Sequence, residues 1–206
     1  MRITAVARSV IEADVATLLT DCDHIFLAAD SALARRLVNS ITHQYLVPNT
    51  QVGSKVSVVD GELADIFSVS RMSNPGGGCL QCNGLIPAWR LTEEATSEIQ
   101  RRRQRYVDDE DIHAPSVITL NAVAASRAVD DWLISVGGLT DQSASDDHWA
   151  FYHPLTDEVI EHDPMKLPGC LHCGPGRFAF GDGKSLLAKP PESRNGRSGP
   201  ALNTWR

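Results

Sequence analysis

The sequence has no long hydrophobic run, few cysteines and fewer basic residues than acidic ones. No stretch of about 18 apolar residues occurs, which excludes a predicted transmembrane helix, and the first residues lack the apolar segment of a secretory signal. The 19 lysines and arginines are outnumbered by 26 aspartates and glutamates, so the net charge of the 206-residue chain is −7. An acidic surface repels phosphate backbones. We therefore expect neither a membrane nor a nucleic acid among the partners of this chain.

Cysteine is scarce, but its spacing is informative. Five cysteines are too few for a disulfide scaffold in a chain of this size. Cys22 stands alone, and the other four form two CxxC pairs, Cys79 with Cys82 and Cys170 with Cys173. Without a predicted secretion signal, this pattern indicates reduced thiolates that bind a metal, and we expect a cytoplasmic location.

The two CxxC pairs predict a structural zinc site. Each pair turns two sulfurs toward a common point, and two pairs supply the four thiolates of a tetrahedral zinc ion. The pairs are farther apart than in a zinc ribbon, so the metal would join distant segments of one fold. A redox dithiol is an alternative that the absence of a thioredoxin-like pattern disfavours. A catalytic zinc is another, which four sulfur ligands disfavour because they leave no open position. Glycines flank both pairs, as tight turns around sulfur require: Gly78, Gly84, Gly169 and Gly174.

The region before the first CxxC pair has the pattern of half a βαβ unit. The apolar run at 25–29 predicts a strand that is buried on both faces. It ends at Asp30 and Ser31, either of which could cap a following helix. The helix is indicated by an apolar stripe that repeats every four residues: Leu33, Leu37, Ile41 and Tyr45. A strand followed by a capped helix is typical of an α/β fold.

The remaining predicted elements are a hairpin over 55–69, a charged helix over 92–105, a long helix from Ser116 to Gly137, and late strands at 149–152 and 158–161. The hairpin is indicated by Asp60-Gly61, a pair that tolerates the positive φ angles of a tight turn. Residues 181–206 are rich in glycine and proline, and we expect a disordered tail there. This leaves residues 1–180 as one domain.

Several segments together resemble the ThiF/MoeB/HesA family, the bacterial relatives of ubiquitin-activating enzymes. The matching motifs are residues 24–31 with Arg35 and Asn39, residues 45–48 with Gly53, the segment Gly78–Cys82, residues 114–121, and the segment Cys170–Gly174. The resemblance covers roughly residues 10–176 and depends on the order of the motifs. Relative to the family, the chain is truncated at its N-terminus.

The resemblance implies a Rossmann-like doubly wound sheet that binds Mg-ATP, together with a zinc ion on four cysteines. Members of the family attach AMP to the carboxyl end of a ubiquitin-like or sulfur-carrier protein, and they are commonly homodimers. Carried over by position, Asp30 is similar to the catalytic aspartate at the nucleotide and magnesium site, with Arg35 and Asn39 as supporting residues. A carboxylate at the carboxyl end of a buried strand lies where such folds bind nucleotides. The alternative is that Asp30 only caps its helix.

Two features depart from the family pattern. The glycine-rich phosphate loop is absent, since the glycine cluster Gly76–Gly78 precedes a cysteine pair rather than a helix. No cysteine directly precedes the segment at 114–116, which argues against a covalent thioester step. We therefore expect an adenylating protein that a partner chain completes. The alternative is a non-catalytic, zinc-stapled module that docks a carrier protein and has lost ATP binding.

Overall fold

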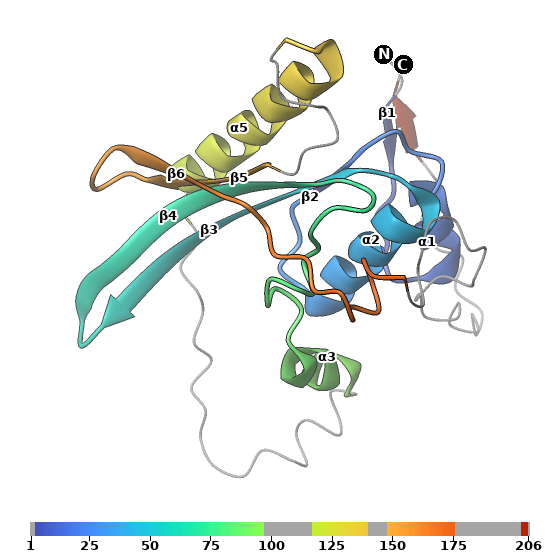
Figure 1. Cartoon of the computed structure of the whole chain (residues 1–206), viewed down its shortest axis with the longest axis horizontal. Helices are drawn as coiled ribbons and strands as arrows, with labels where there is room; N and C mark the ends of the chain where they lie inside the picture. The colour runs from blue at the N-terminus through green and yellow to red at the C-terminus, as the bar shows by residue number, and fades with distance from the viewer. Residues whose placement is uncertain (1–2, 97–116, 140–147, 176–202, 206) are drawn as a thin grey trace.

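The computed structural model describes residues 3–96, 117–139, 148–175 and 203–205 (Figure 1). In chain order the elements are β1 (Ile3–Ala5), α1 (Ala13–Leu19), β2 (Ile25–Leu27), α2 (Ala32–Tyr45), β3 (Asn49–Val59), β4 (Glu62–Ser73), α3 (Ala88–Ala95), α5 (Ile118–Gly137), β5 (His148–His153), β6 (Glu158–His162) and β7 (Asn203–Trp205). The predicted hairpin, the helix after Ser31 and the two late strands are confirmed. Of the helix predicted over 92–105, residues 92–95 lie in α3, which begins earlier, at Ala88. The part from residue 97 onward lies outside the described residues.

The central sheet is mixed. Its five strands lie in the order β2-β3-β4-β5-β6, and β2 is parallel to β3 while the three other neighbouring pairs are antiparallel. The β3–β4 pair is antiparallel because a tight turn joins it, in which Asp60 and Gly61 have φ angles of 54° and 83°. The predicted α/β class is confirmed. The expected doubly wound sheet is corrected in the described part of the chain, where one parallel pair is extended by antiparallel strands.

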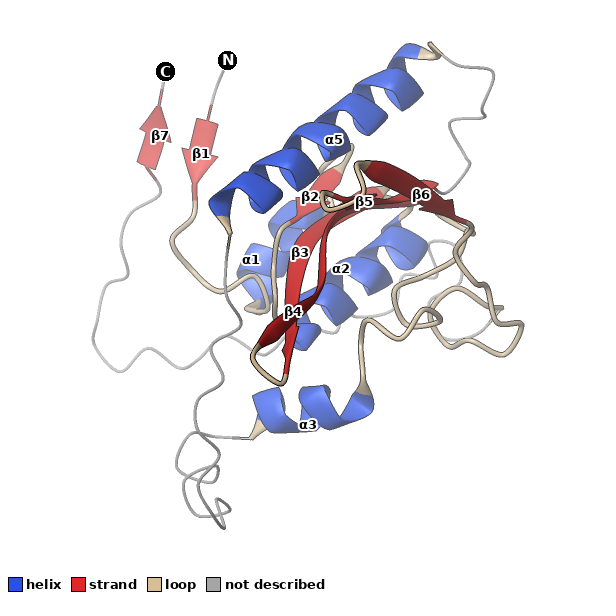
Figure 2. Cartoon of the chain, turned by 90° about the vertical axis from the view of Figure 1, so that its left-hand side faces the viewer, coloured by secondary structure: helices blue, strands red, loops and turns tan. Residues whose placement is uncertain are grey.

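Helices cover both faces of this sheet (Figure 2). On one face, alternate residues of β2 join the apolar stripe of α2 in a common core: Ile25, Leu27, Leu37, Val38 and Ile41. On the other face, the ring of Phe26 lies 6.0 Å from the ring of Trp132 on α5. Successive side chains of a strand point to opposite faces. β2 therefore contacts both helical layers, but Phe26 is 45% exposed. The predicted burial of this strand on both faces is thus wrong on the face toward α5, and only the face toward α2 is buried.

The helix ends follow from local residue types. Ser31 caps α2, and its Oγ accepts a hydrogen bond from the Ala34 N–H at 3.3 Å. Gly138 ends α5 in the left-handed conformation, with a φ of 59°, which agrees with the predicted glycine stop. The expected cap at Ser116 lies outside the described residues, and α5 begins at Ile118.

The first and last described strands pair with each other. β1 and β7 form an antiparallel two-stranded sheet in which Ile3 lies opposite Trp205 and Ala5 lies opposite Asn203. Of the predicted tail at 181–206, only β7 is among the described residues. The domain boundary at residue 180 stays a prediction.

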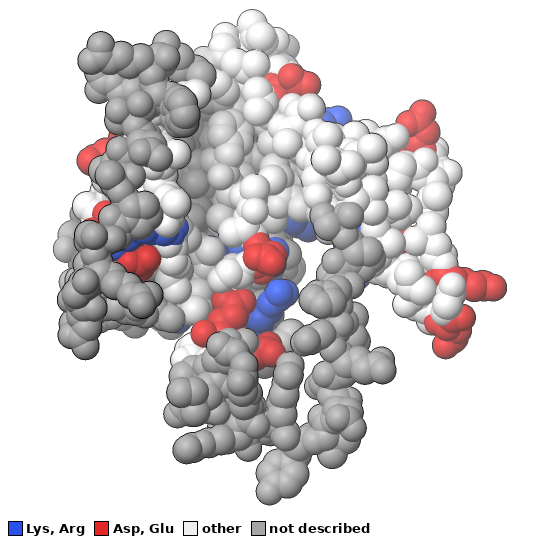
Figure 3. All heavy atoms as spheres, turned by 180° about the vertical axis from the view of Figure 1, so that it is seen from behind, with Lys and Arg blue, Asp and Glu red and all other residues white. Residues whose placement is uncertain are grey.

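The described surface is mixed in charge on the face shown in Figure 3. Acidic and basic side chains lie there in small separate groups among uncharged residues. None of the helices that the structure describes is both long enough and apolar enough to cross a membrane.

Candidate functional site

The four paired cysteines meet at one point. The Sγ atoms of Cys79 and Cys170 lie 3.7 Å apart, and those of Cys82 and Cys173 lie 3.5 Å apart. All four sulfurs lie within 4.8 Å of one another. A tetrahedral zinc ion with Zn–S bonds of about 2.3 Å separates its sulfurs by about 3.8 Å. The cluster therefore has the size of such a site, and these four residues could hold a metal ion.

Backbone N–H groups surround the sulfurs. The N–H of Cys82 donates to Cys79 Sγ at 3.4 Å, within the first CxxC turn. The N–H of Leu167 donates to Cys82 Sγ and that of His172 donates to Cys170 Sγ, both also at 3.4 Å. Such donors stabilise thiolate charge and fix the direction of the ligand atoms. The tight turns thus hold the sulfurs in a position and a hydrogen-bonding environment that favour cation binding.

The thiols differ in how readily they lose a proton. Burial raises the pKa of the Cys79 thiol to about 12, and it also raises the pKa of Cys173. At Cys170 burial acts in the same direction, but the N–H groups of Cys173 and His172 outweigh it and lower the pKa to about 7. Cys170 is therefore poised as a thiolate near neutral pH. The Cys79 and Cys173 thiols need the positive charge of a metal to ionise.

Two asparagines hold the first CxxC turn. Asn39 is fully buried on α2, and its Oδ1 accepts a hydrogen bond from the Leu80 N–H at 2.9 Å. Asn83 links the two cysteine-bearing segments, because its Nδ2 donates to the carbonyl oxygens of Cys79 and Met165 at 2.9 and 3.0 Å. Its Oδ1 accepts from the Met165 N–H at 2.9 Å. Asn39 thus faces the cysteine cluster rather than the end of β2, and its nucleotide contact stays a prediction.

Two of the flanking glycines lie where a side chain would collide. A Cβ at Gly78 would come within 2.8 Å of the carbonyl oxygens of Pro164 and Met165. A Cβ at Gly174 would come within 2.5 Å of the carbonyl oxygen of Cys170. The expected need for glycine around the sulfurs is therefore confirmed at these two positions, because the backbones approach too closely for any other residue.

Asp30 and Arg35 lie together at the carboxyl end of β2. Asp30 follows the strand and is exposed. Arg35 is half-buried, and its Nε donates to the carbonyl oxygen of Ala29 at 3.2 Å. Burial and the nearby Arg90 lower the pKa of Arg35, while the charges of Asp30 and Glu94 act in the opposite direction. The structure thus brings together two of the three residues predicted for the nucleotide site.

Glu94, which no sequence motif singles out, closes the N-terminus of α2. Its Oε1 accepts a hydrogen bond from the Ala32 N–H at 2.7 Å. Its Oε2 accepts from the Leu33 N–H at 2.9 Å and from Ser31 Oγ at 2.7 Å. Burial raises the pKa of Glu94, but these donors outweigh it and hold the pKa below its ordinary value. Glu94 lies on α3, 61 to 63 positions from its partners, so only the fold reveals this contact.

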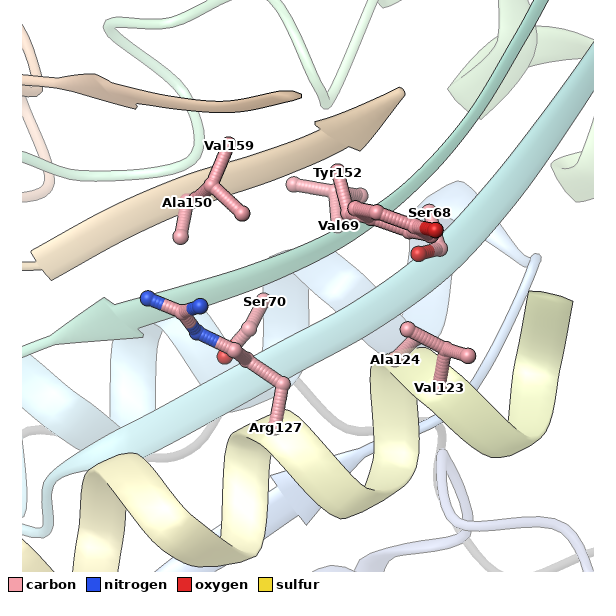
Figure 4. Close-up of a pocket in the computed structure, with 9 residues that line it drawn as sticks. All are labelled: Ser68, Val69, Ser70, Val123, Ala124, Arg127, Ala150, Tyr152 and Val159. Carbon is pink, nitrogen blue, oxygen red and sulfur yellow. The ribbon is translucent and has the colours of Figure 1, made fainter. Parts of the chain in front are cut away.

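A small cavity lies between α5 and the sheet, and a polar network lies beside it (Figure 4 shows the residues that line the cavity). Asp131 accepts a hydrogen bond from Ser70 Oγ at 2.9 Å, and Arg127 lies 3.5 Å from Asp131 and 3.8 Å from Glu161. The cavity beside these residues measures about 10 Å³. Such a volume holds about one water molecule. The network therefore packs α5 against the sheet and leaves no space for a larger ligand.

No family model matches the sequence, and no curated protein matches it. Solved structures do match. E. coli MccB with ATP superposes with a TM-score of 0.53 at 15% identity, over 82% of this chain and 44% of that chain. The complex of MccB with MccA-N7isoASN gives 0.54 at 16% identity, over 82% and 46%. The complex with AMPCPP and selenomethionine-labelled MccA gives 0.52 at 15% identity, over 82% and 44%.

The fold is shared with MccB. At this level of identity the likeness concerns the fold alone. The chain spans less than half the length of the MccB chains that it matches.

Proposed function

We propose that this chain belongs to an ATP-dependent enzyme that adenylates the carboxyl end of a peptide or small carrier protein. The observation that carries the proposal is the place of Asp30, an exposed carboxylate three residues beyond the end of β2 in a fold shared with ATP-bound MccB. In open α/β sheets, ligands bind outside the carboxyl ends of the parallel strands. β2 and β3 are the parallel pair of the described sheet, and β2 ends opposite Gln51 while β3 continues to Val59. The carboxyl end of β2 is therefore the natural place for a nucleotide.

Asp30 and Arg35 would act on different parts of the nucleotide. The Asp30 carboxylate would hold Mg²⁺ against the phosphates, because Mg²⁺ prefers one or two carboxylates together with phosphate oxygens. Arg35, positioned by Ala29, would direct its remaining N–H groups at the charge that develops around the α-phosphorus. The substrate carboxylate would form a bond to the α-phosphorus, the bond to the bridging oxygen would break, and pyrophosphate would leave.

The proposal includes the partners of this site. MccB has been solved with the peptide MccA, which supports a peptide carboxyl end as the acceptor. A ubiquitin-like or sulfur-carrier protein would present the same chemistry through a flexible carboxyl-terminal tail. No glycine-rich phosphate loop occurs in the sequence, so the remaining phosphate contacts would come from a second copy of this chain or from a partner chain.

The cysteine cluster would hold a structural zinc ion. Four sulfurs satisfy tetrahedral zinc and leave no position for substrate or water. The ion would fix the two cysteine-bearing segments to each other and, through Asn39 and Leu80, to α2. Because α2 begins beside Asp30, the cluster would position the nucleotide site without taking part in its chemistry.

A calorimetric titration of Mg-ATP into the zinc-loaded chain tests the nucleotide site. We expect saturable binding that weakens by at least about tenfold in Asp30→Asn, because the Mg²⁺ ligand loses its charge. Asp23→Asn is the matched control, since Asp23 is an exposed aspartate that precedes the same strand. This control should bind Mg-ATP as the wild type does.

The outcomes decide whether Asp30 and this chain take part in nucleotide chemistry. Exchange of labelled pyrophosphate into ATP that depends on an added peptide with a free carboxyl end, in the presence of any completing chain, would support adenylation directly. Binding that survives unchanged in Asp30→Asn would remove Asp30 from the nucleotide site, and the capping alternative does not apply, because Ser31 is the N-cap of α2. Absence of Mg-ATP binding in the wild type would contradict a nucleotide site on this chain alone.

A non-catalytic docking module is the second candidate, and Glu94 is the observation that favours it. The Glu94 carboxylate already accepts the N–H groups of Ala32 and Leu33 that a phosphate could use at the start of α2. Such a module would bind the carrier protein equally well with and without ATP. Measuring carrier binding in both conditions distinguishes it from an adenylating enzyme.

A further inference from the structure

A cavity of about 570 Å³ lies beside the cysteine cluster, and the proposed adenylation chemistry does not use it. It is bounded by α3, by the two cysteine-bearing turns and by one residue of α2. Figure 1 shows α3 and the segment that carries the second CxxC pair on the same side of the molecule as α2. The volume falls in the range of small-molecule and peptide-anchor pockets.

Apolar side chains form most of its wall. Ile86 is fully buried there and Leu91 is half-buried, while Leu167 and Leu171 are 51% and 64% exposed. Exposed leucine surface is unfavourable in water by about 25 cal/mol per Å². Apolar side chains gathered around an opening are typical of a surface that a ligand or partner covers. The wall therefore favours an occupant with an apolar body.

Arg36 supplies the unsatisfied hydrogen-bonding group of this cavity. It lines the wall from α2, and its buried Nε has no hydrogen-bond partner in the part of the chain that the structure describes. No carboxylate among the described residues forms an ion pair with it. A guanidinium only donates hydrogen bonds, and no described group accepts one from Arg36, so its terminal N–H groups are available to an oxygen atom that enters the cavity.

The charge of the wall selects the kind of oxygen. Cys82 and Cys170 border the same cavity. A divalent ion on four thiolates remains negatively charged overall, which opposes an anionic ligand beside Arg36. The best acceptor is therefore an uncharged oxygen attached to apolar groups. The backbone carbonyl of an apolar peptide segment has this chemistry.

We propose that this cavity binds an uncharged apolar segment of the peptide that the enzyme activates. A backbone carbonyl accepts a hydrogen bond from Arg36, and a leucine-sized side chain contacts Leu91 and Leu171. The identity of the occupant as the activated peptide rests on the proposed function. The position agrees with it, because Arg36 follows Arg35 on α2 and Leu91 lies one turn from Glu94 on α3. The same two helices thus form the cavity and the carboxyl edge of β2.

Fluorescence anisotropy with a labelled Ala-Leu-Leu-Ala amide and the zinc-loaded full chain tests the site. We expect saturable binding, and binding at least about tenfold weaker for the Ala-Asp-Asp-Ala amide. Arg36→Met and Leu171→Ser should each weaken binding of the leucine peptide about tenfold. Lys55→Gln is the matched control, because it removes one positive charge from an exposed position on β3 and should leave the affinity unchanged.

The use of two variants keeps the test decisive if one of them does not fold. Metal content and circular dichroism check each protein, and Leu171→Ser changes an exposed side chain that the fold does not need. Equal binding of the two peptides, or unchanged affinity in Leu171→Ser and in a folded Arg36→Met, would overturn the proposal. Peptide binding without Mg-ATP binding would support the peptide site and contradict the proposed adenylation. Mg-ATP binding without peptide binding would support the nucleotide site and contradict the peptide site.

Discussion

The cysteine cluster and the carboxyl edge of β2 adjoin the same helix, α2, but they are built in opposite ways. At the cluster, four sulfurs lie within 4.8 Å of one another and two asparagines fix the turns around them. At the edge, Asp30 is exposed, and Arg35 is fixed by a single backbone carbonyl. The cluster contains every ligand that a metal needs. At the carboxyl end of β2, the charged groups of Asp30 and Arg35 remain available to a ligand.

This difference shows how one helix serves a structural site and a proposed reactive one. The middle of α2 is fixed to the first CxxC turn, because the buried Asn39 accepts a hydrogen bond from the Leu80 N–H. At its N-terminus, the Glu94 carboxylate accepts hydrogen bonds from the N–H groups of Ala32 and Leu33, which have no partner within the helix. Stability should therefore depend on the cluster far more than on the edge. Three substitutions, taken from the largest expected effect to the smallest, test that contrast.

Cys79→Ser should have the largest effect. Loss of one thiolate removes a metal ligand, and metal binding in such sites is coupled directly to folding. We expect loss of bound zinc together with several kcal/mol of stability, which corresponds to a fall of roughly 10 °C in Tm. Cys22→Ser is the matched control, because Cys22 is exposed and outside the cluster. A metal-free Cys79→Ser protein as stable as the wild type would contradict the zinc site.

Asn39→Ala should have an intermediate effect. It leaves the buried Leu80 N–H without its acceptor, at a cost of about 1–3 kcal/mol. Urea unfolding measures that cost, and competition with a chelator measures the zinc affinity. Asn49→Ala is the comparison, since Asn49 is equally buried but donates to Thr42 Oγ1. Both variants should lose stability, and only Asn39→Ala should also lose zinc affinity.

Glu94→Gln should have the smallest effect, about 0.5–1 kcal/mol near neutral pH, because it removes only the charge at the start of α2. The pKa of Glu94 is held below its ordinary value of 4.5. A lowered carboxylate pKa stabilises the fold fully above that value, and the contribution is lost as the pH falls through the folded-state pKa. The difference from the wild type in urea unfolding should therefore shrink below pH 4.5. Glu93→Gln, an exposed neighbour, should show no such dependence.

Much of the cluster could be predicted from the sequence because its information is local. The CxxC spacing itself directs both sulfurs of a pair to one point. The glycines beside each pair indicate that another backbone segment lies too close for a side chain. Gly78 and Gly174 show that this reasoning holds at the level of single atoms. The helix from Ala32 and the hairpin at Asp60-Gly61 were predictable for the same reason, since a cap and a turn pair act on their immediate neighbours.

The remainder depended on contacts between distant residues. Nothing near Glu94 indicates that it reaches the start of α2, and Asn39 lies on a buried face whose neighbour, Leu80, is 41 positions away. The antiparallel pairing of β5 with β4 also could not be predicted, because an antiparallel and a parallel neighbour use similar apolar runs. These contacts exist only after the chain has packed, so periodicity and spacing carry no record of them.

The two halves of the cysteine cluster come from positions 91 residues apart, with α3, α5, β5 and β6 between them. Bringing such remote points together costs an unfolded chain about 4 kcal/mol of entropy, and it comes late because many nearer contacts can form sooner. A growing chain therefore presents only the two sulfurs of its first CxxC pair until residues 170–173, which follow β6 and precede β7, have been synthesised. A metal ion on all four sulfurs would require both cysteine-bearing segments to have met, so the metal content of a preparation would report the fraction of chains in which they have done so.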